Sequence, residues 1–274
     1  MVRSGIDILP VILITESGTG SFDVYIAANH ALWDRSSCDV AADLLETYLN
    51  QSGSTKPDDL TYSDYIQCRN TAEKSVHSKE DSGTILSSIE LYKARSAGTY
   101  ENKSFSVTLK KDENVTYDVR WLMSKFSEIS DTKDLSSIPF FMLYHCRDDR
   151  SMNTIGYYID YIPCVYDKKR QEICFYDEAI DKLKEGSAEY HFLGDEYASG
   201  ICDDVPVVNL KESIDMMSEE MNQIEIYNLG SQSAQEGIEC CLDGDKVYVG
   251  MGFHMHGVSD EEFYRRIQKA FSIT

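Results

Sequence analysis

The sequence predicts a mixed α+β fold, because strand-like and helix-like segments alternate along its 274 residues. Residues 22–28 carry an apolar side chain at every second position, which is typical of a strand. Residues 139–144 form a continuous apolar run, as in a strand that is buried on both faces. Residues 263–271 repeat apolar side chains at helical spacing, which predicts an amphipathic helix near the end of the chain.

The other elements follow from the same periodicities and from turn and capping signals. A hairpin is expected over residues 11–28, because a Gly/Ser-rich turn at 17–21 separates two apolar runs. Ser36 and Asp39 resemble a capping box that opens a helix reaching Tyr48. Further expectations are a loop over 51–59, a helix over 85–94, a strand over 105–109, a helix over 117–129, a strand over 155–165, an acidic irregular stretch over 166–206 with a short helix at 178–183, a helix over 210–221, a hairpin turn at Asp243–Gly244, and a last helix capped by Ser259 and Glu262.

Composition excludes several classes of function. The chain has 47 acidic and 26 basic residues, a net charge of −21, which disfavours nucleic acids and anionic membranes as partners. No apolar stretch is long enough to span a bilayer, and the N-terminal residues lack the pattern of a signal peptide. The eight cysteines are scattered without a Cys-x-x-Cys pair, so we expect reduced thiols in a cytoplasmic protein.

One short motif can carry chemistry. The alternating strand that includes Tyr25 ends at His30, and Asp34 follows just before a helix. A histidine at a strand end can face a cleft, where its near-neutral pKa suits proton transfer. Asp34 is better placed to hold the loop by pairing with a basic residue.

The segment Asn29-His30-Ala-Leu-Trp-Asp34-Arg35 resembles the His-His-x-x-x-Asp-Gly motif of the condensation domains of non-ribosomal peptide synthetases, which group with chloramphenicol-acetyltransferase-like acyltransferases. Three further segments resemble family motifs in the family's order: Tyr62-Ser-Asp-Tyr65, His145-Cys-Arg147-Asp148 and Thr154-Ile-Gly156 through Pro163. The first histidine of the motif is Asn29 here, and its glycine is Arg35.

The resemblance implies a chloramphenicol-acetyltransferase-like, two-lobed α/β sandwich with its active site in a tunnel between the lobes. Residues 1–95 would be the remainder of the first lobe and carry the motif, and residues 96–274 would be the second lobe. Family members are longer at the front, so we expect an N-terminally truncated domain. It would be a fragment, or another chain or domain would supply the missing part of the first lobe. A sheet deprived of those strands would expose apolar faces, so self-association is expected.

The resemblance also implies a function. A condensation-type acyltransferase moves an acyl or aminoacyl group from a thioester, on the phosphopantetheine of a carrier protein or on CoA, to an amine or hydroxyl. His30 would be catalytic, and Asp34 would be structural and paired with Arg147. Asn29 and Gly156 are further motif positions, and neither a metal nor a bound cofactor is expected. The alternative is a degenerate, non-catalytic docking or binding module, which Asn29 and Arg35 favour; an epimerase is disfavoured by Leu143.

Some simpler interpretations stay open at this point. Asp34 could merely cap the helix that follows, and Arg35 and Arg150 are rivals of Arg147 for its carboxylate. His254 and His256 share one strand face but lack a third ligand, so exposed strand histidines are favoured over a metal site. The Tyr157–Tyr158 pair is most simply sheet packing.

Overall fold

The computed structural model describes residues 10–29, 32–50, 61–96, 100–191, 205–211, 221–228 and 236–273. These residues form two compact units. The first comprises Met1–Glu73, His145–Asp160 and Gly186–Tyr190, and the second comprises Lys74–Tyr144, Tyr161–Glu185 and His191–Thr274. These units are defined by their compactness, whereas the expected boundary between two lobes at residue 95 comes from the family resemblance. That boundary stays a prediction.

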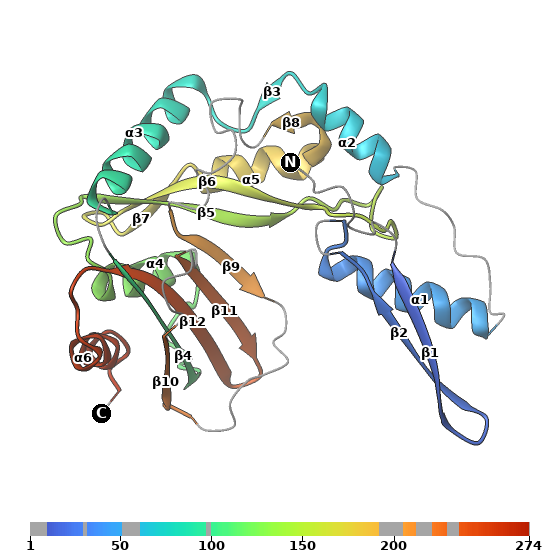
Figure 1. The fold of residues 1–274 in the computed structure, drawn as a ribbon. Helices are drawn as coiled ribbons and strands as arrows, with labels where there is room; N and C mark the ends of the chain where they lie inside the picture. Colours follow the sequence, from blue (N-terminus) through green and yellow to red (C-terminus); the bar gives the residue numbers. More distant parts are fainter. Residues whose placement is uncertain are drawn as a thin grey trace. The chain divides into compact units, whose positions relative to one another are not determined.

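A two-stranded antiparallel hairpin opens the first unit (Figure 1). Strand β1 spans Val11–Gly18 and strand β2 spans Ser21–Ala27, with Leu13 opposite Tyr25. Gly20 at the turn has φ of 81°, a conformation that glycine adopts without steric cost. The hairpin predicted from the alternating pattern is therefore confirmed.

Two helices complete most of the first unit. Helix α1 spans Arg35–Leu49, and helix α2 spans Tyr62–Asn70. The expectation that Ser36 caps α1 was wrong, because Asp34 is the N-cap residue and Ser36 already lies inside the helix. Helix α2 was not expected from the sequence, although Thr61 and Asp64 form a capping box at its start. A short 3₁₀ helix, η1, follows at Ser187–Glu189.

The second unit is built around a mixed sheet. Among the described residues, eight strands are hydrogen-bonded in the order β10-β4-β12-β11-β9-β5-β6-β7. Strand β9 is parallel to both β5 and β11, whereas β11, β12, β4 and β10 are successively antiparallel. The strands are β4 Glu101–Lys110, β5 Ser137–His145, β6 Ile159–Asp167, β7 Glu172–Cys174, β9 Val207–Lys211, β10 Ile224–Asn228, β11 Gly237–Asp243 and β12 Lys246–Met255. The short strands β3 Lys74–Ser75 and β8 Tyr190–His191 lie outside this sheet.

Four helices accompany the sheet: α3 Lys79–Ser96, α4 Val119–Ile129, α5 Tyr176–Gly186 and α6 Asp260–Phe271. Helices α4 and α6 pack against each other and against the sheet through aromatic rings. The Phe253 ring of β12 lies 4.8 Å from that of Phe126 and 5.7 Å from that of Phe263, measured between centroids. All three side chains are buried, and each contributes roughly 1.5–3 kcal/mol by leaving water.

Most of the expected elements of the second unit are confirmed. Helix α4, strand β4, the β11–β12 turn at Gly244 and the Ser259 cap of α6 occur where the sequence predicts them. The strand expected from residue 155 begins at Ile159. The helix expected over 210–221 was wrong at Leu210, because this residue belongs to β9. The rest of that prediction, over 212–220, lies outside the described residues, as does the loop expected over 51–59. Residues 192–204 of the expected acidic stretch also lie outside them. None of the described helices is both long and apolar enough to cross a membrane.

Candidate active site

The loop between β2 and α1 carries the predicted motif. The backbone N–H groups of Leu32 and Trp33 donate to the Asn29 carbonyl oxygen over 2.9 and 3.2 Å. Asp34 then adopts an extended conformation, with φ of −85° and ψ of 176°, as an N-cap residue should. Its Oδ1 accepts a hydrogen bond from the Ser37 backbone N–H over 2.8 Å. His30 and Ala31, between these residues, lie outside the described part of the chain.

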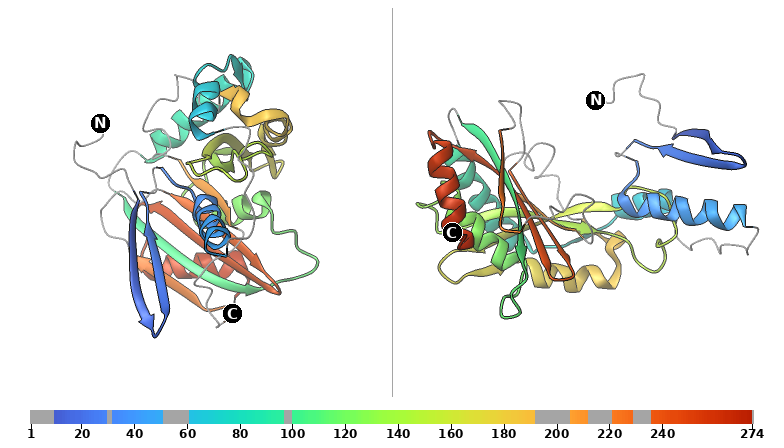
Figure 2. Two further views of the ribbon diagram at one scale, coloured as in Figure 1. Left: turned by 90° about the vertical axis from the view of Figure 1, so that its right-hand side faces the viewer. Right: turned by 90° about the horizontal axis from the view of Figure 1, so that it is seen from below.

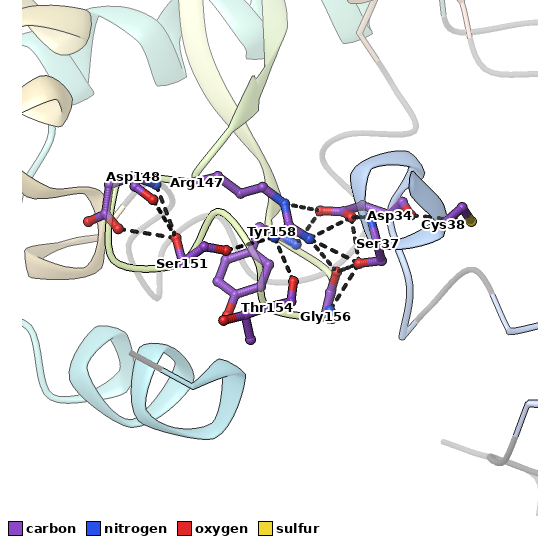
Figure 3. Close-up of polar contacts among 9 residues, drawn as sticks. All are labelled: Asp34, Ser37, Cys38, Arg147, Asp148, Ser151, Thr154, Gly156 and Tyr158. Atoms are coloured by element: carbon purple, nitrogen blue, oxygen red, sulfur yellow. Dashed lines mark hydrogen bonds and ion pairs between the residues drawn. The ribbon is translucent and has the colours of Figure 1, made fainter. Parts of the chain in front are cut away.

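Asp34 also forms a buried ion pair with Arg147, within the same compact unit (Figure 3). Arg147 Nη2 donates to Asp34 Oδ1 over 2.9 Å, and Nε donates to Oδ2 over 3.3 Å. The two side chains are only 5% and 0% exposed. Such a two-pronged contact uses the planar fork of a guanidinium, which lysine lacks. The predicted pair is therefore present.

Asp34 caps α1, but the alternative that it merely caps the helix was wrong, because the same carboxylate has enough acceptor positions to pair with Arg147 as well. The two rival arginines lie elsewhere. Arg35 is an exposed residue of the first turn of α1, 3.9 Å from Asp39, and Arg150 pairs with Asp148 over 2.7 Å.

Arg147 connects Asp34 to the chain segment that precedes β6. Its Nη1 donates to the carbonyl oxygens of Ser151 and Thr154 over 2.8 and 2.6 Å. The guanidinium also lies over the Tyr158 ring, 4.4 Å from its centroid, in a cation–π contact. One side chain thus holds the turn at 151–158 and the start of α1 together (Figure 3).

Ser37 is the second link between these two segments. The sequence pattern does not single it out, because Ser36 with Asp39 resembles the capping box. The Ser37 hydroxyl is completely buried. It accepts from the Gly156 N–H and from Arg147 Nη2, both over 3.0 Å. It lies 2.7 Å from both Asp34 Oδ1 and the Gly156 carbonyl oxygen, and it can donate its single proton to either.

The electrostatics of Asp34 suit a structural role. Burial would raise the pKa of the carboxyl, but hydrogen bonds from Arg147, Ser37 and the Tyr158 backbone N–H outweigh it and hold the pKa below its usual value. The Tyr158 N–H donates to Oδ2 over 3.1 Å. Asp34 therefore stays ionised at neutral pH, and its oxygens are occupied. The expected role of Tyr158 in sheet packing was wrong, because this residue precedes β6 and belongs to the Asp34 network.

Gly156 is required by close packing. A Cβ atom at this position would lie 2.5 Å from two atoms of the Tyr62 ring and 2.9 Å from Tyr158 Cε2, distances that no real Cβ tolerates. The rings of Tyr62 and Tyr65, both from α2, lie 5.1 and 4.8 Å from that of Tyr158. The predicted motif segments at 62–65 and 154–163 therefore meet in the structure.

Helix α2 is also tied to β6 by an ion pair between Arg69 and Asp160. Cys146 lies beside this contact, and burial raises the pKa of its thiol to about 11. At neutral pH this cysteine is therefore a thiol rather than a thiolate.

The described residues contain no group of three or more histidine, cysteine or acidic side chains that could hold a metal ion. The expectation that His254 is an exposed strand histidine was wrong. His254 is 5% exposed, stacks on Tyr100 at 4.1 Å, and donates its backbone N–H to the buried Glu236 carboxylate over 2.9 Å. The regular alternation of β12 buries Phe253 and Met255, so His254 lies on the opposite face of the strand, where Tyr100 and Glu236 cover it.

Comparison with solved structures identifies the fold. The chain is similar to a condensation domain that mediates chain release from the enacyloxin polyketide synthase, with a TM-score of 0.56 and 9% sequence identity over 95% of this chain. It is also similar to the protein CT and to a mutant of it, with TM-scores of 0.56 and 0.58 and 10% identity over 96% of this chain. This chain has the fold of a condensation domain. No protein-family model and no curated protein sequence matches it.

The predicted chloramphenicol-acetyltransferase-like fold class is therefore confirmed. The chain spans 59% of the length of the enacyloxin condensation domain structure and 65% of the two CT structures. At 9–10% identity, the likeness to condensation domains lies in the fold alone.

Proposed function

We propose that this chain catalyses condensation-type acyl transfer, with His30 as its catalytic residue. The buried Asp34–Arg147 pair carries the proposal. It anchors the loop that contains His30 to the turn before β6, and it uses two residues that the resemblance to condensation domains had paired beforehand. A loop that carries an acid–base group must be held still, because a positioned group is what makes proton transfer efficient.

In the proposed reaction, the lone pair of an amine or hydroxyl attacks the carbonyl carbon of a thioester. A new C–N or C–O bond forms, the tetrahedral intermediate collapses, and the C–S bond breaks to release a thiol. His30 orients or deprotonates the nucleophile and stabilises charge in the intermediate, and the nucleophile's proton ends on the departing thiol. Asp34 and Arg147 hold the loop and exchange no proton. The Asn29 carbonyl oxygen accepts hydrogen bonds from the N–H groups of Leu32 and Trp33, and Gly156 leaves room for the Tyr62 ring.

The acyl donor would be a thioester on the phosphopantetheine arm of a carrier protein or on CoA. That group is a substrate, and the mechanism needs neither a metal nor a resident cofactor. A carrier protein is thus the proposed partner, and a chain or domain that completes the first lobe stays a prediction. Free thiols on all the described cysteines fit the proposed cytoplasmic location.

The alternative is a non-catalytic module that keeps the fold for docking. Asn29 and Arg35, which replace a histidine and a glycine of the family motif, favour it. The argument from Arg35 is weak, because this residue begins α1 in helical conformation with its side chain exposed. No left-handed backbone conformation is imposed on it, so the replacement causes no strain.

The proposal is tested by incubating the full chain with acetyl-CoA or a carrier-bound aminoacyl thioester and a panel of amines and alcohols. We expect acceptor-dependent release of free thiol, followed with a thiol reagent, together with an amide or ester product identified by mass spectrometry. Thiol release that is absent with every donor and acceptor, from a chain shown to be folded, would favour the docking module.

A further inference from the structure

The β1–β2 hairpin exposes an unusual amount of apolar surface. Eight large apolar side chains on its two strands are between 38% and 63% exposed. They are Val11, Ile12, Leu13, Ile14, Phe22, Val24, Tyr25 and Ile26. Soluble proteins seldom leave so continuous a set uncovered unless another molecule covers it.

The exposed side chains lie on both faces of the hairpin. In the antiparallel register, Ile12 lies opposite Ile26 and Ile14 opposite Val24, so these four share one face. Leu13 lies opposite Tyr25 on the other face. Within the described part of the chain, each strand pairs only with the other, and Figure 2 shows them as a separate two-stranded ribbon. An isolated two-stranded hairpin is marginally stable in water, and three or more strands are needed for independent stability.

The hairpin is also depleted in charge. Residues 10–29 contain two charged side chains, Glu16 and Asp23, whereas 27% of the whole chain is charged. Depletion of charge in an apolar patch is typical of the core of a protein interface. Asp23 lies in the middle of β2, where a charge discourages edge pairing, but no charge lies on β1 from Val11 to Thr15. The outer edge of β1 is therefore the edge suited to a further strand.

We propose that β1 pairs with β1 of a second copy of this chain, antiparallel and about a two-fold axis at Leu13. In this register Ile12 lies opposite Ile14 of the second copy, and Val11 lies opposite its Thr15. The result is a four-stranded sheet in the order β2-β1-β1-β2. On one face it would join Ile12, Ile14, Val24 and Ile26 of both copies into a single apolar surface.

The uncharged, apolar run Val11–Thr15 offers the same edge on both copies, which suits an isologous pairing, and the acidic side chains do not oppose it. With the two-fold axis at Leu13, Glu16 of one chain lies opposite Pro10 of the other. The two Glu16 positions are then six residues apart along the strands, or about 20 Å at a rise of about 3.4 Å per residue. That separation exceeds the Debye length of about 8 Å at physiological salt, so their repulsion is screened. The same screening reduces the repulsion between two chains that each carry a net charge of −21.

The test is the mass of the full chain in solution, measured by sedimentation and by light scattering over a range of concentrations. A chain of 31.1 kDa is expected to give a concentration-dependent dimer that raised salt strengthens. Leu13→Lys should shift the mass to that of the monomer, because a lysine on an edge strand opposes pairing. Leu49→Lys is the matched control: Leu49 is 66% exposed and Leu13 55%, but Leu49 lies on α1 outside the hairpin, so this variant should still dimerise.

A crosslinking measurement tests the register. With the exposed Cys38 and Cys68 replaced by serine, Leu13→Cys should form a covalent dimer on mild oxidation, and Ser17→Cys should not. A monomer at every concentration would overturn the proposal and favour a different polypeptide as the occupant. Dimerisation of Leu13→Lys as strong as that of the unsubstituted chain, or equal crosslinking of the two cysteine variants, would also overturn it. None of these outcomes depends on acyl transfer.

Discussion

The Asp34 carboxylate accepts from Arg147 through both of its oxygens, while Oδ1 also accepts the Ser37 N–H that caps α1. One buried side chain thus ends a loop, starts a helix and binds a turn more than a hundred residues away in the sequence. The N-terminus of α1 and the turn at 151–158 are held together by the same contact.

Asp34→Ala should destabilise the first unit by about 3–5 kcal/mol, because it leaves the buried Arg147 charge without its partner. The control is Asp118→Ala, which removes the N-cap of α4 in the second unit and should cost about 1 kcal/mol. Trp33 and Trp121 are the two tryptophans and lie in different units. Urea unfolding of Asp34→Ala is therefore followed by Trp33 fluorescence in a Trp121→Phe background, and that of Asp118→Ala by Trp121 fluorescence in a Trp33→Phe background. Equal costs for the two aspartate variants would contradict the buried pair.

The same pair predicts a pH dependence. Because the folded-state pKa of Asp34 lies below its unfolded value of about 3.9, its contribution is complete above that pH and is lost as the pH falls through the folded pKa. The difference in unfolding free energy between the unsubstituted chain and Asp34→Asn should be constant from pH 7 to pH 5 and shrink below about pH 4. A difference that grew on acidification would mean that burial, not Arg147, sets the pKa.

Ser37→Ala should cost about 1–3 kcal/mol, because the buried N–H of Gly156 loses its acceptor. Ser36→Ala, one residue earlier in α1, should change the unfolding free energy by less than about 0.5 kcal/mol, as for a surface substitution. Urea unfolding of both variants shows which of the two serines connects α1 to the turn at Gly156. If Ser36→Ala were the more damaging, the cap would lie where the sequence first suggested.

Gly156→Ala should destabilise by about 1–3 kcal/mol, since the added methyl group meets the Tyr62 ring. Gly83→Ala is the control, because its Cβ would meet nothing within 4 Å, and a helical alanine should stabilise by up to about 1 kcal/mol. Combining Gly156→Ala with Tyr62→Ala should cost less than the sum of the two single changes. Strict additivity would show that the two residues do not contact each other.

The sequence predicts those elements whose local pattern and burial agree. The β1–β2 hairpin and helix α6 follow from alternation, helical spacing, a glycine turn and a serine cap. Helix α2 was missed because it has no continuous apolar stripe, and only the Thr61–Asp64 capping box marks it. Strand β9 was mistaken at Leu210 because a short apolar run is compatible with either a strand or a helix segment.

Of the candidate site, the Asp34–Arg147 pair could be predicted because family order brought together two residues that no local pattern connects. Ser37 and Tyr158 could not, because their contacts depend on the backbone path of residues 151–158. Periodicity says which face of an element a side chain occupies, but it does not say which turn meets that side chain.

The central claim is that His30 performs acyl transfer, and its most direct test is the turnover of His30→Ala in the thiol-release assay. The variant should fold like the unsubstituted chain and lose turnover by about 10²–10⁴-fold, the usual contribution of a positioned acid–base group. Unchanged turnover in a correctly folded His30→Ala protein would contradict the account and remove His30 from the mechanism.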